Sequence, residues 1–144
     1  MQRNLTEFAK VVQCLDPDAY AATAQNGTVI DTAGYDELLY IVQAGDLGTS
    51  ATLDAKAQEG DASNLSDAAD ITGAAITQLT KASPDDSNQA CLIRIKLNAN
   101  RKRYHRIVVT PGTAACDAGA IALLTNTGKL PVSQPTYVAE TVTV

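Results

Sequence analysis

Apolar residues recur at every second position through much of the chain, which is the spacing of a β-strand with one buried face. The clearest case is CLIRIKLN, residues 91–98, whose apolar positions share one face while Arg94 and Lys96 lie on the other. Residues 37–44 are apolar on both faces, so we expect this strand to be central. Further strands are predicted over residues 28–31, 51–58, 71–80, 102–110 and 118–125.

Turn-forming residues separate these segments. Gly, Asp, Ser and Asn dominate residues 59–70, SPDDSNQ occupies residues 83–89, and Pro111-Gly112 ends another run. Residues 98–101 make a plausible hairpin turn between two of the predicted strands. Many short strands joined by many turns predict an all-β fold, either a β-sandwich or a small barrel of short antiparallel strands.

The two ends of the chain depart from this alternation. Residues 1–26 carry Leu5, Phe8, Val12 and Leu15 at roughly helical spacing, which predicts a short helix or an ordered arm. At the other end, residues 129–144 hold two prolines and then a β-prone stretch with a single charge, so we expect an extended arm that adds to a sheet edge, either its own or that of a neighbouring subunit. The predicted sandwich domain therefore spans residues 27–128.

Composition and charge narrow the possible functions. The chain of 144 residues fits one domain, and with no Trp and one Phe its core must be built from small aliphatic side chains. Its net charge of -5 disfavours nucleic acid as a partner. No apolar run is long enough to span a membrane, and the N-terminus has no long apolar stretch of a secretory signal, so we expect folding in the cytoplasm.

Residue types that carry chemistry are few. Cys14, Cys91 and Cys116 lack metal-binding or redox spacing and are expected to be buried free thiols. His105 is the only histidine, and its phase with Ile107 indicates a structural, partly buried residue rather than a catalytic base. The acidic loops lack the regular spacing of a calcium site. We therefore expect no enzyme activity, no cofactor and no metal.

The run RKRYHR, residues 101–106, is the one cluster of positive charge. A hairpin at residues 98–101 would bring its alternate side chains onto the outer face that carries Arg94 and Lys96. Such a patch suits a solvated hairpin or an acidic protein surface better than nucleic acid, because only one tyrosine accompanies it. The predicted patch comprises Arg94, Lys96, Lys102, Tyr104 and Arg106.

Several of these stretches occur in an order that resembles a known group of proteins. A turn containing Gly27 is followed by IDTAGYDELLYIVQAG, a strand ending at QEGD, then KRYHRIVVTPG and AGAIALL. Over about residues 27–125 this order is similar to that of the small capsid decoration, or cement, proteins of tailed bacteriophages. The chain departs from that pattern after Lys129, where the proline-containing arm replaces a short ending.

The resemblance implies a virion structural protein on the capsid exterior, which binds the major capsid protein and forms a homo-oligomer, a dimer or trimer. Other phage head or tail proteins and a carbohydrate-binding or adhesion β-sandwich remain alternatives. Candidate protein contacts lie in the N-terminal segment, the basic cluster and the C-terminal arm. They are Phe8, Arg94, Lys96, Arg101, Lys102, Arg103, Tyr104, Arg106, Tyr137, Val138, Val142 and Val144.

Overall fold

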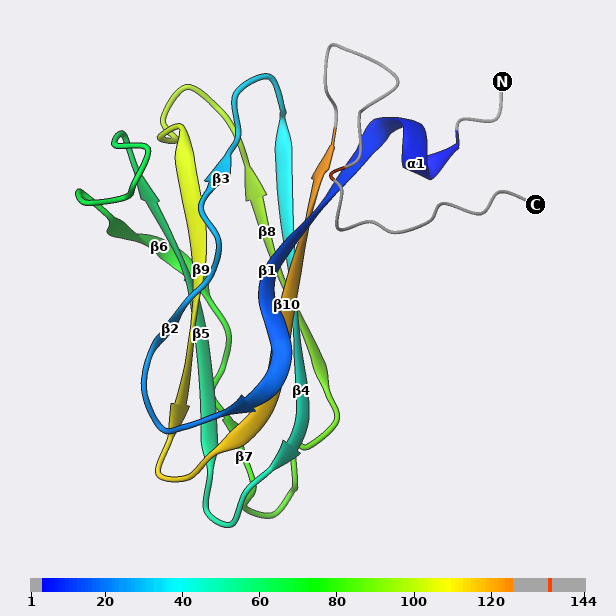
Figure 1. Ribbon diagram of the computed structural model, residues 1–144, viewed down its shortest axis with the longest axis vertical. Coiled ribbons are helices and arrows are strands. Elements are labelled where there is room, and N and C mark those ends of the chain that lie inside the picture. The colour runs from blue at the N-terminus through cyan, green and yellow to red at the C-terminus, as the bar shows by residue number, and fades with distance from the viewer. Residues whose placement is uncertain (1–3, 126–134, 136–144) are drawn as a thin grey trace.

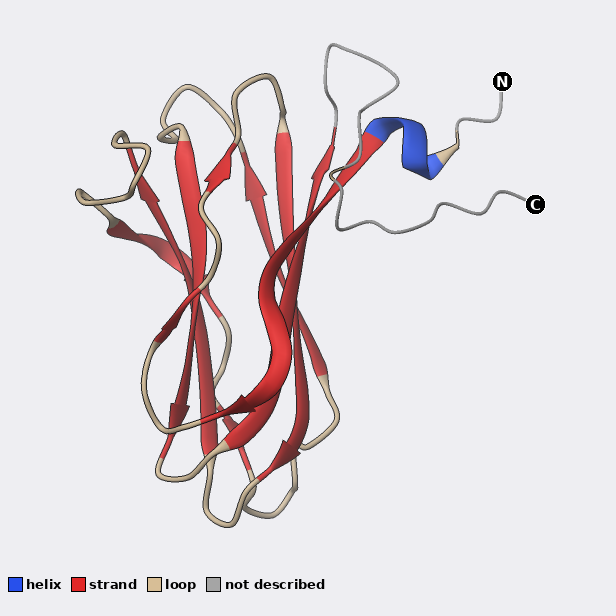
Figure 2. Ribbon diagram, viewed as in Figure 1, coloured by secondary structure: helices blue, strands red, loops and turns tan. Residues whose placement is uncertain are grey.

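A computed structural model describes residues 4–125 and residue 135, and this part of the chain is almost entirely β-structure (Figures 1 and 2). It confirms the predicted all-β sandwich of antiparallel strands. The elements are α1 (Leu5–Phe8), β1 (Ala9–Tyr20), β2 (Gln25–Asn26), β3 (Ile30–Asp31), β4 (Glu37–Leu47), β5 (Thr52–Gly60), β6 (Ala69–Ala75), β7 (Leu79–Thr80), β8 (Ala90–Lys96), β9 (Tyr104–Gly112) and β10 (Cys116–Thr125).

The strands form two sheets that pack face to face (Figure 1). Sheet A has the order β1-β10-β4-β8. Sheet B has the order β2-β9-β5-β6, with β3 also paired to β9 and β7 also paired to β5. Because β2 and β3 pair with successive parts of β9, they act as one interrupted edge strand. Strands β6 and β7 pair with successive parts of β5 and form the edge strand at the other side of sheet B. Each sheet therefore has four strand positions.

The order of these positions along the chain identifies the topology. After β1 in sheet A the chain crosses to β2 and β3 in sheet B, returns to β4, and crosses again to β5. Among the described residues, only the connection from β5 to β6 and β7 stays within one sheet; the chain then alternates through β8, β9 and β10. The eight strand positions of this part of the chain, in two four-stranded antiparallel sheets with this order, make a jelly roll, which is built from two Greek keys.

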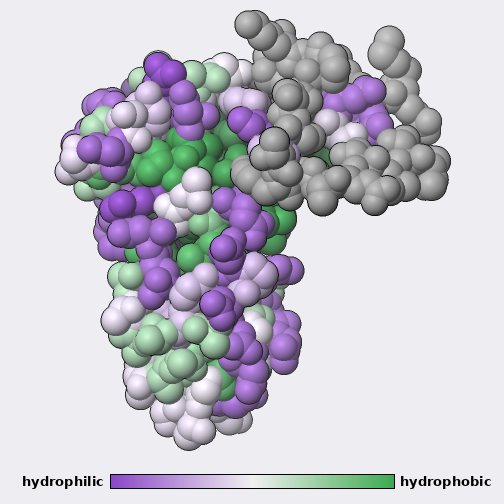
Figure 3. All heavy atoms as spheres, in the orientation of Figure 1, coloured by the Kyte–Doolittle hydropathy of each residue, from purple (hydrophilic) through white to green (hydrophobic). Residues whose placement is uncertain are grey.

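Side chains that alternate inward from both sheets build the core. In β4, Leu38, Tyr40 and Val42 are almost fully buried, and β5 buries its predicted alanine and leucine positions in the same alternating way. Alanines also dominate the buried face of β10, so the two sheets can pack with small side chains between them. Apolar side chains are visible between the sheets in Figure 3, with polar side chains over the outer strands.

The N-terminal segment differs from the helix or arm expected over residues 1–26. In the described part of this segment, from Asn4 onward, only Leu5–Phe8 is helical, and from Ala9 the chain is strand β1, which pairs with β10 inside sheet A. The adjacent β-branched residues Val11 and Val12 favour a strand. Irregular register around Leu15 then allows the strand to continue past Pro17, so helical spacing of a few apolar residues was misleading here.

The predicted hairpin between β8 and β9 is wrong. The turn at Asn98–Arg101 is present, with the Arg101 amide donating to the Asn98 carbonyl at 2.9 Å, but β8 lies in sheet A and β9 in sheet B. The chain crosses the end of the sandwich here, where the Thr32 side chain donates to the Arg103 carbonyl at 2.7 Å. A period of two shows which face of a strand is buried, but it does not show which strand is its neighbour.

Candidate protein-contact surface

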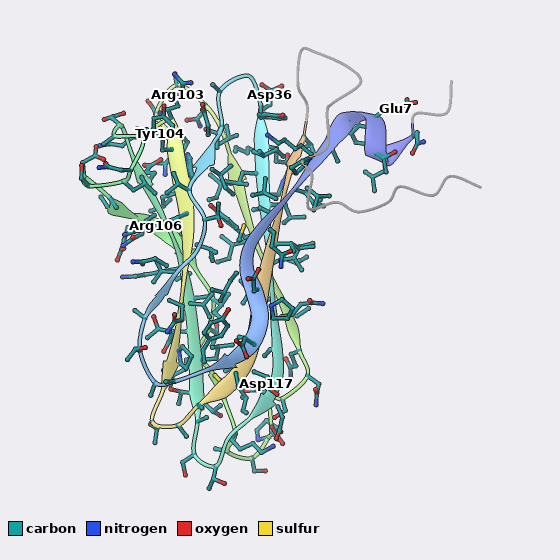
Figure 4. All side chains as sticks on the ribbon, in the orientation of Figure 1. Glu7, Asp36, Arg103, Tyr104, Arg106 and Asp117 are labelled. Atoms are coloured by element: carbon teal, nitrogen blue, oxygen red, sulfur yellow. The ribbon has the colours of Figure 1, made fainter. Side chains whose placement is uncertain are left out.

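The structure divides the candidate contact residues into separate groups. Phe8, Arg94 and Lys96 belong to sheet A or to the helix that leads into it. Residues 101–106 lie on the crossing and on β9 in sheet B, and Figure 4 shows Arg103, Tyr104 and Arg106 there, far from Glu7 on α1. The predicted patch of Arg94, Lys96, Lys102, Tyr104 and Arg106 is therefore wrong, although Arg101 lines one hollow together with Arg94 and Lys96. Tyr137, Val138, Val142 and Val144 lie outside the described residues.

Most cations of the basic cluster, residues 101–106, are paired with carboxylates or with one side-chain amide. Two hydrogen bonds of 2.9 and 2.7 Å join the Arg103 guanidinium to the Asp31 carboxylate. Ion pairs also join Lys102 Nζ to Asp61 at 3.1 Å and Arg101 to Glu59 at 3.2 Å. In β9, the Arg106 Nε donates to the Gln58 side-chain oxygen at 2.8 Å, so the run presents less free positive charge than its sequence suggests.

Arg94 is neutralised in the same way on sheet A. Its Nε and Nη2 each donate to Glu37 at 2.7 Å in a bidentate pair between neighbouring strands. The hydrogen bond with Arg94 lowers the pKa of the Glu37 carboxyl, and the bond with Arg103 lowers the pKa of Asp31. Lys96, in contrast, makes no ion pair with any residue that the structure describes.

The outer face of sheet A carries two rows of apolar side chains that run across its strands. The strand register aligns Val11, Leu123 and Leu39 in one row, which ends at Arg94. These residues alternate with the buried positions of their strands, so they point away from the core. Each of the three apolar side chains is partly exposed.

The second row lies next to the first. Gln13, Ile121, Ile41 and Leu92 are aligned across the four strands, and the Leu92 side chain is 64% exposed. A soluble domain usually places polar side chains on the outer face of such a sheet. Contiguous apolar surface with a polar rim marks an interaction site. We call this surface the sheet A face; it comprises Val11, Leu39, Ile41, Leu92, Ile121 and Leu123.

A signal for the sheet A face was present in the sequence but was incompletely interpreted. Residues 37–44 are apolar on both faces, which indicated a central strand, and β4 does lie inside sheet A. Strand β10 is likewise apolar on both faces, because Ile121 and Leu123 alternate with its buried residues. Because the outer face of this sheet has no covering layer among the described residues, the second apolar face of these strands is a surface and not a second core.

His105 is fully buried and does not belong to a reactive site. Its Nε2 lies 2.8 Å from the Lys102 carbonyl oxygen, so this nitrogen carries the proton and donates it. Within the described part of the chain, its Nδ1 has no hydrogen-bond partner. Burial lowers the pKa of the imidazole, opposed by the Lys102 carbonyl and by Glu59, whose Oε2 is 3.9 Å away. The residue is more buried than the sequence indicated.

The remaining chemistry-bearing groups do not form a centre either. Cys14 and Cys116 are buried free thiols as expected, whereas Cys91 is partly exposed. Burial raises the pKa of the Cys14 thiol to about 12, which makes it unreactive. Among residues 4–125 and 135, no three His, Cys, Asp or Glu side chains are grouped to hold a metal ion. No described helix is long and apolar enough to cross a membrane.

Two of the surface hollows in the described part of the chain border sheet A. One, of about 610 Å³, lies over Gly45 and Gly119 near Pro17 and is bordered by Asp18 and Asp117. The other, of about 380 Å³, lies between β6 and β8, and its lining includes Arg94, Lys96 and Arg101. Both are open and shallow, which suits contact with another macromolecule better than enclosure of a small molecule.

Comparison with known proteins shows a similarity of fold but no family. No family model matches the sequence, and no curated protein matches it. The VP2 subviral particle of infectious bursal disease virus matches with a TM-score of 0.52 and 11% identity over 87% of this chain. The chain spans 34% of the length of that VP2 chain. At this identity the similarity shows a shared fold alone.

Two further solved structures match over nearly their whole length but with lower scores. The SPBc2 prophage-derived protein YomS has a TM-score of 0.44 and 9% identity, covering 82% of this chain and 95% of that one. A structure of Bacillus endospore appendages, described as a novel family of disulfide-linked pili, has a TM-score of 0.39 and 15% identity, covering 89% and 98%.

Proposed function

We propose that this chain is a structural protein of a bacteriophage virion that binds the outer surface of the assembled capsid and stabilises it. Its partners are the major capsid protein and further copies of itself, in a dimer or trimer. The role is decoration, or cementing, and it requires no catalysis. The order of sequence segments that resembles decoration proteins and the jelly-roll fold both support this proposal.

The sheet A face is the observation that carries the proposal. A protein that reinforces a shell needs a stiff scaffold with a surface suited to another protein. Here the buried sides of β4 and β10 fix the scaffold, and their outer sides present Leu39, Ile41, Ile121 and Leu123. Arg94 and Glu37 at the border provide polar groups that fix the orientation of a partner.

The fold comparison adds support of a different kind. The VP2 chain that shares the fold assembles, by its description, into a subviral particle. Jelly rolls also occur in lectins. A sugar platform needs exposed aromatic rings, however, and the described tyrosines are buried or only partly exposed.

A face made of a few partly exposed aliphatic side chains suits weak contacts that are repeated many times. Association costs about 4 to 15 kcal/mol in lost freedom, so one such contact is marginal alone. Copies that are linked into an oligomer bind a repeating shell together, and this multivalency converts marginal contacts into stable attachment.

Co-sedimentation with capsids that lack the protein tests this function. We expect the purified chain to pellet with such capsids up to a saturating number of copies per shell. The double variant Ile41→Glu/Leu123→Glu should pellet at least tenfold less, because each carboxylate would have to be desolvated in the contact. Both positions are on the outer face, so the variant should remain folded by circular dichroism.

Gln58→Glu is the matched control, because it adds a carboxylate on the outer face of sheet B. It should pellet like the wild-type chain. Failure of the wild-type chain to bind any capsid form would contradict the proposal. Equal loss of binding in the control and in the sheet A variant would show that charge, and not the sheet A face, governs attachment.

A further inference from the structure

The hollow between β6 and β8 follows the free edges of two strands. Five consecutive residues of β8, from Leu92 to Lys96, line it, although alternate residues point to opposite sides of sheet A. Five consecutive residues of the β6 segment, Ile71–Ala75, line the other side. A hollow that is lined by both orientations of a strand runs along its backbone edge and not over one of its faces.

These edges are open to strand addition within the described part of the chain. The strand order places β8 last in sheet A and β6 last in sheet B, and the two strands do not pair with each other. Edge strands leave a row of backbone N–H and C=O groups available to an added strand. An extended segment seated here would hydrogen-bond to the backbone and place alternate side chains against Ile71, Ile93 and Ile95.

The charge of the lining selects the kind of segment that fits. Arg94, Lys96 and Arg101 line the hollow, and none of its described lining residues is acidic. Arg94 and Arg101 are already paired with Glu37 and Glu59, so Lys96 is the cation of this lining that has no described ion-pair partner. A strand that carries a carboxylate is favoured beside Lys96.

The chain itself contains one stretch with these properties outside the sandwich strands. Residues 136–144, TYVAETVTV, hold six β-branched residues and a single charge, Glu140. Ten residues including Pro131 and Pro135 separate this stretch from Thr125. A chain of ten residues can reach at most about 33 Å. The β8 edge of the same molecule is only two strand spacings, about 10 Å, from the end of β10.

We infer that residues 136–144 of one copy add as a strand to the β8 edge of a second copy, with Glu140 beside the cationic rim at Lys96. This inference rests on the proposed function in one respect, because it names the contact that builds the homo-oligomer. A strand exchanged between copies joins them through backbone hydrogen bonds and leaves the sheet A face available for the capsid.

Charge reversal in the full-length chain tests the exchange, with the oligomeric state measured by analytical ultracentrifugation. The variants Lys96→Glu and Glu140→Lys should each weaken self-association about tenfold, because like charges then meet in the contact. Mixing the two variants should restore it. In a mixed pair, the unchanged Glu140 of the first variant meets the unchanged Lys96 of the second. The two substituted side chains meet each other with opposite charges, so both contacts are complementary.

The mixture also separates exchange between copies from docking within one molecule. If each arm folded onto its own β8, complementary charges would meet only when both substitutions were in one chain. Mixing the two single variants would then restore no contact, and this result would overturn the inference. The single variant Glu7→Lys, a reversal on α1, is the control and should self-associate like the wild-type chain, because it keeps both Lys96 and Glu140. A wild-type chain that remains monomeric would also overturn it, even if that chain bound capsids and the capsid-binding part of the proposed function stood.

Discussion

His105 gives the molecule a specific response to acid at the scale of a single residue. Its ring is fully buried, and its Nδ1 has no described partner that could accept a proton from the charged form. Around it, Glu59 favours the charged form and Arg101 opposes it, while the Lys102 carbonyl accepts from Nε2. Desolvation is the largest of these effects, so the folded-state pKa lies below that of the unfolded chain.

We predict that acid weakens the fold through this residue. As pH falls below about 6.5, the unfolded chain binds a proton that the folded chain does not bind, so the free energy of unfolding decreases by up to about 1.4 kcal/mol per pH unit. Urea unfolding at several pH values between 7 and 5 measures the slope. The His105→Gln variant should show a smaller slope whatever its absolute stability. An unchanged slope would assign the acid response to other groups.

At the scale of an element, the interrupted edge strand formed by β2 and β3 depends on a close approach at Gly27. The Gly27 amide donates to the Ile107 carbonyl at 2.8 Å, and the next amide, of Thr28, donates to the Cys14 carbonyl at 2.8 Å. A Cβ at Gly27 would lie 2.8 Å from the Ile107 side chain and about 3 Å from both carbonyl oxygens. This residue therefore ties sheet A to sheet B where the edge strand breaks.

Gly27→Ala should destabilise the protein by about 1 to 3 kcal/mol, because backbone atoms on both sides cannot move apart cheaply. Chemical denaturation followed by circular dichroism measures the change. Thr28→Ala is the control, since its exposed side chain can be removed while both backbone hydrogen bonds remain; it should change stability by less than about 0.5 kcal/mol. Equal stability of Gly27→Ala and the wild-type chain would refute the close approach.

The elements also show which part of the fold the sequence could predict. Alternation placed the buried faces of β5 and β8 correctly, and the turn residues separated the strands. Neighbour relationships could not be obtained in this way. The turn at Asn98–Arg101 has the composition of a hairpin but joins two sheets, and strand β1 was obscured by apolar residues at helical spacing.

At the scale of the whole molecule, the assignment of each strand to a sheet decides where the contact surface lies. The basic cluster was predicted as one patch because a hairpin would align its side chains, and the sheet assignment separates them. The sheet A face becomes visible only once β1, β10, β4 and β8 are placed side by side, since each strand contributes one or two of its residues. The composition indicated that aromatic residues are few, whereas the apolar face can be identified only from the order of the strands in sheet A.

A cryo-electron microscopy map of capsids saturated with the chain tests the central claim most directly, because it shows which face of the sandwich meets the shell. We predict that Leu39, Ile41 and Leu123 of sheet A lie against the capsid protein and that Tyr104 and Arg106 of sheet B face outward. A map in which the sheet A face points to solvent while β9 contacts the shell would contradict this account.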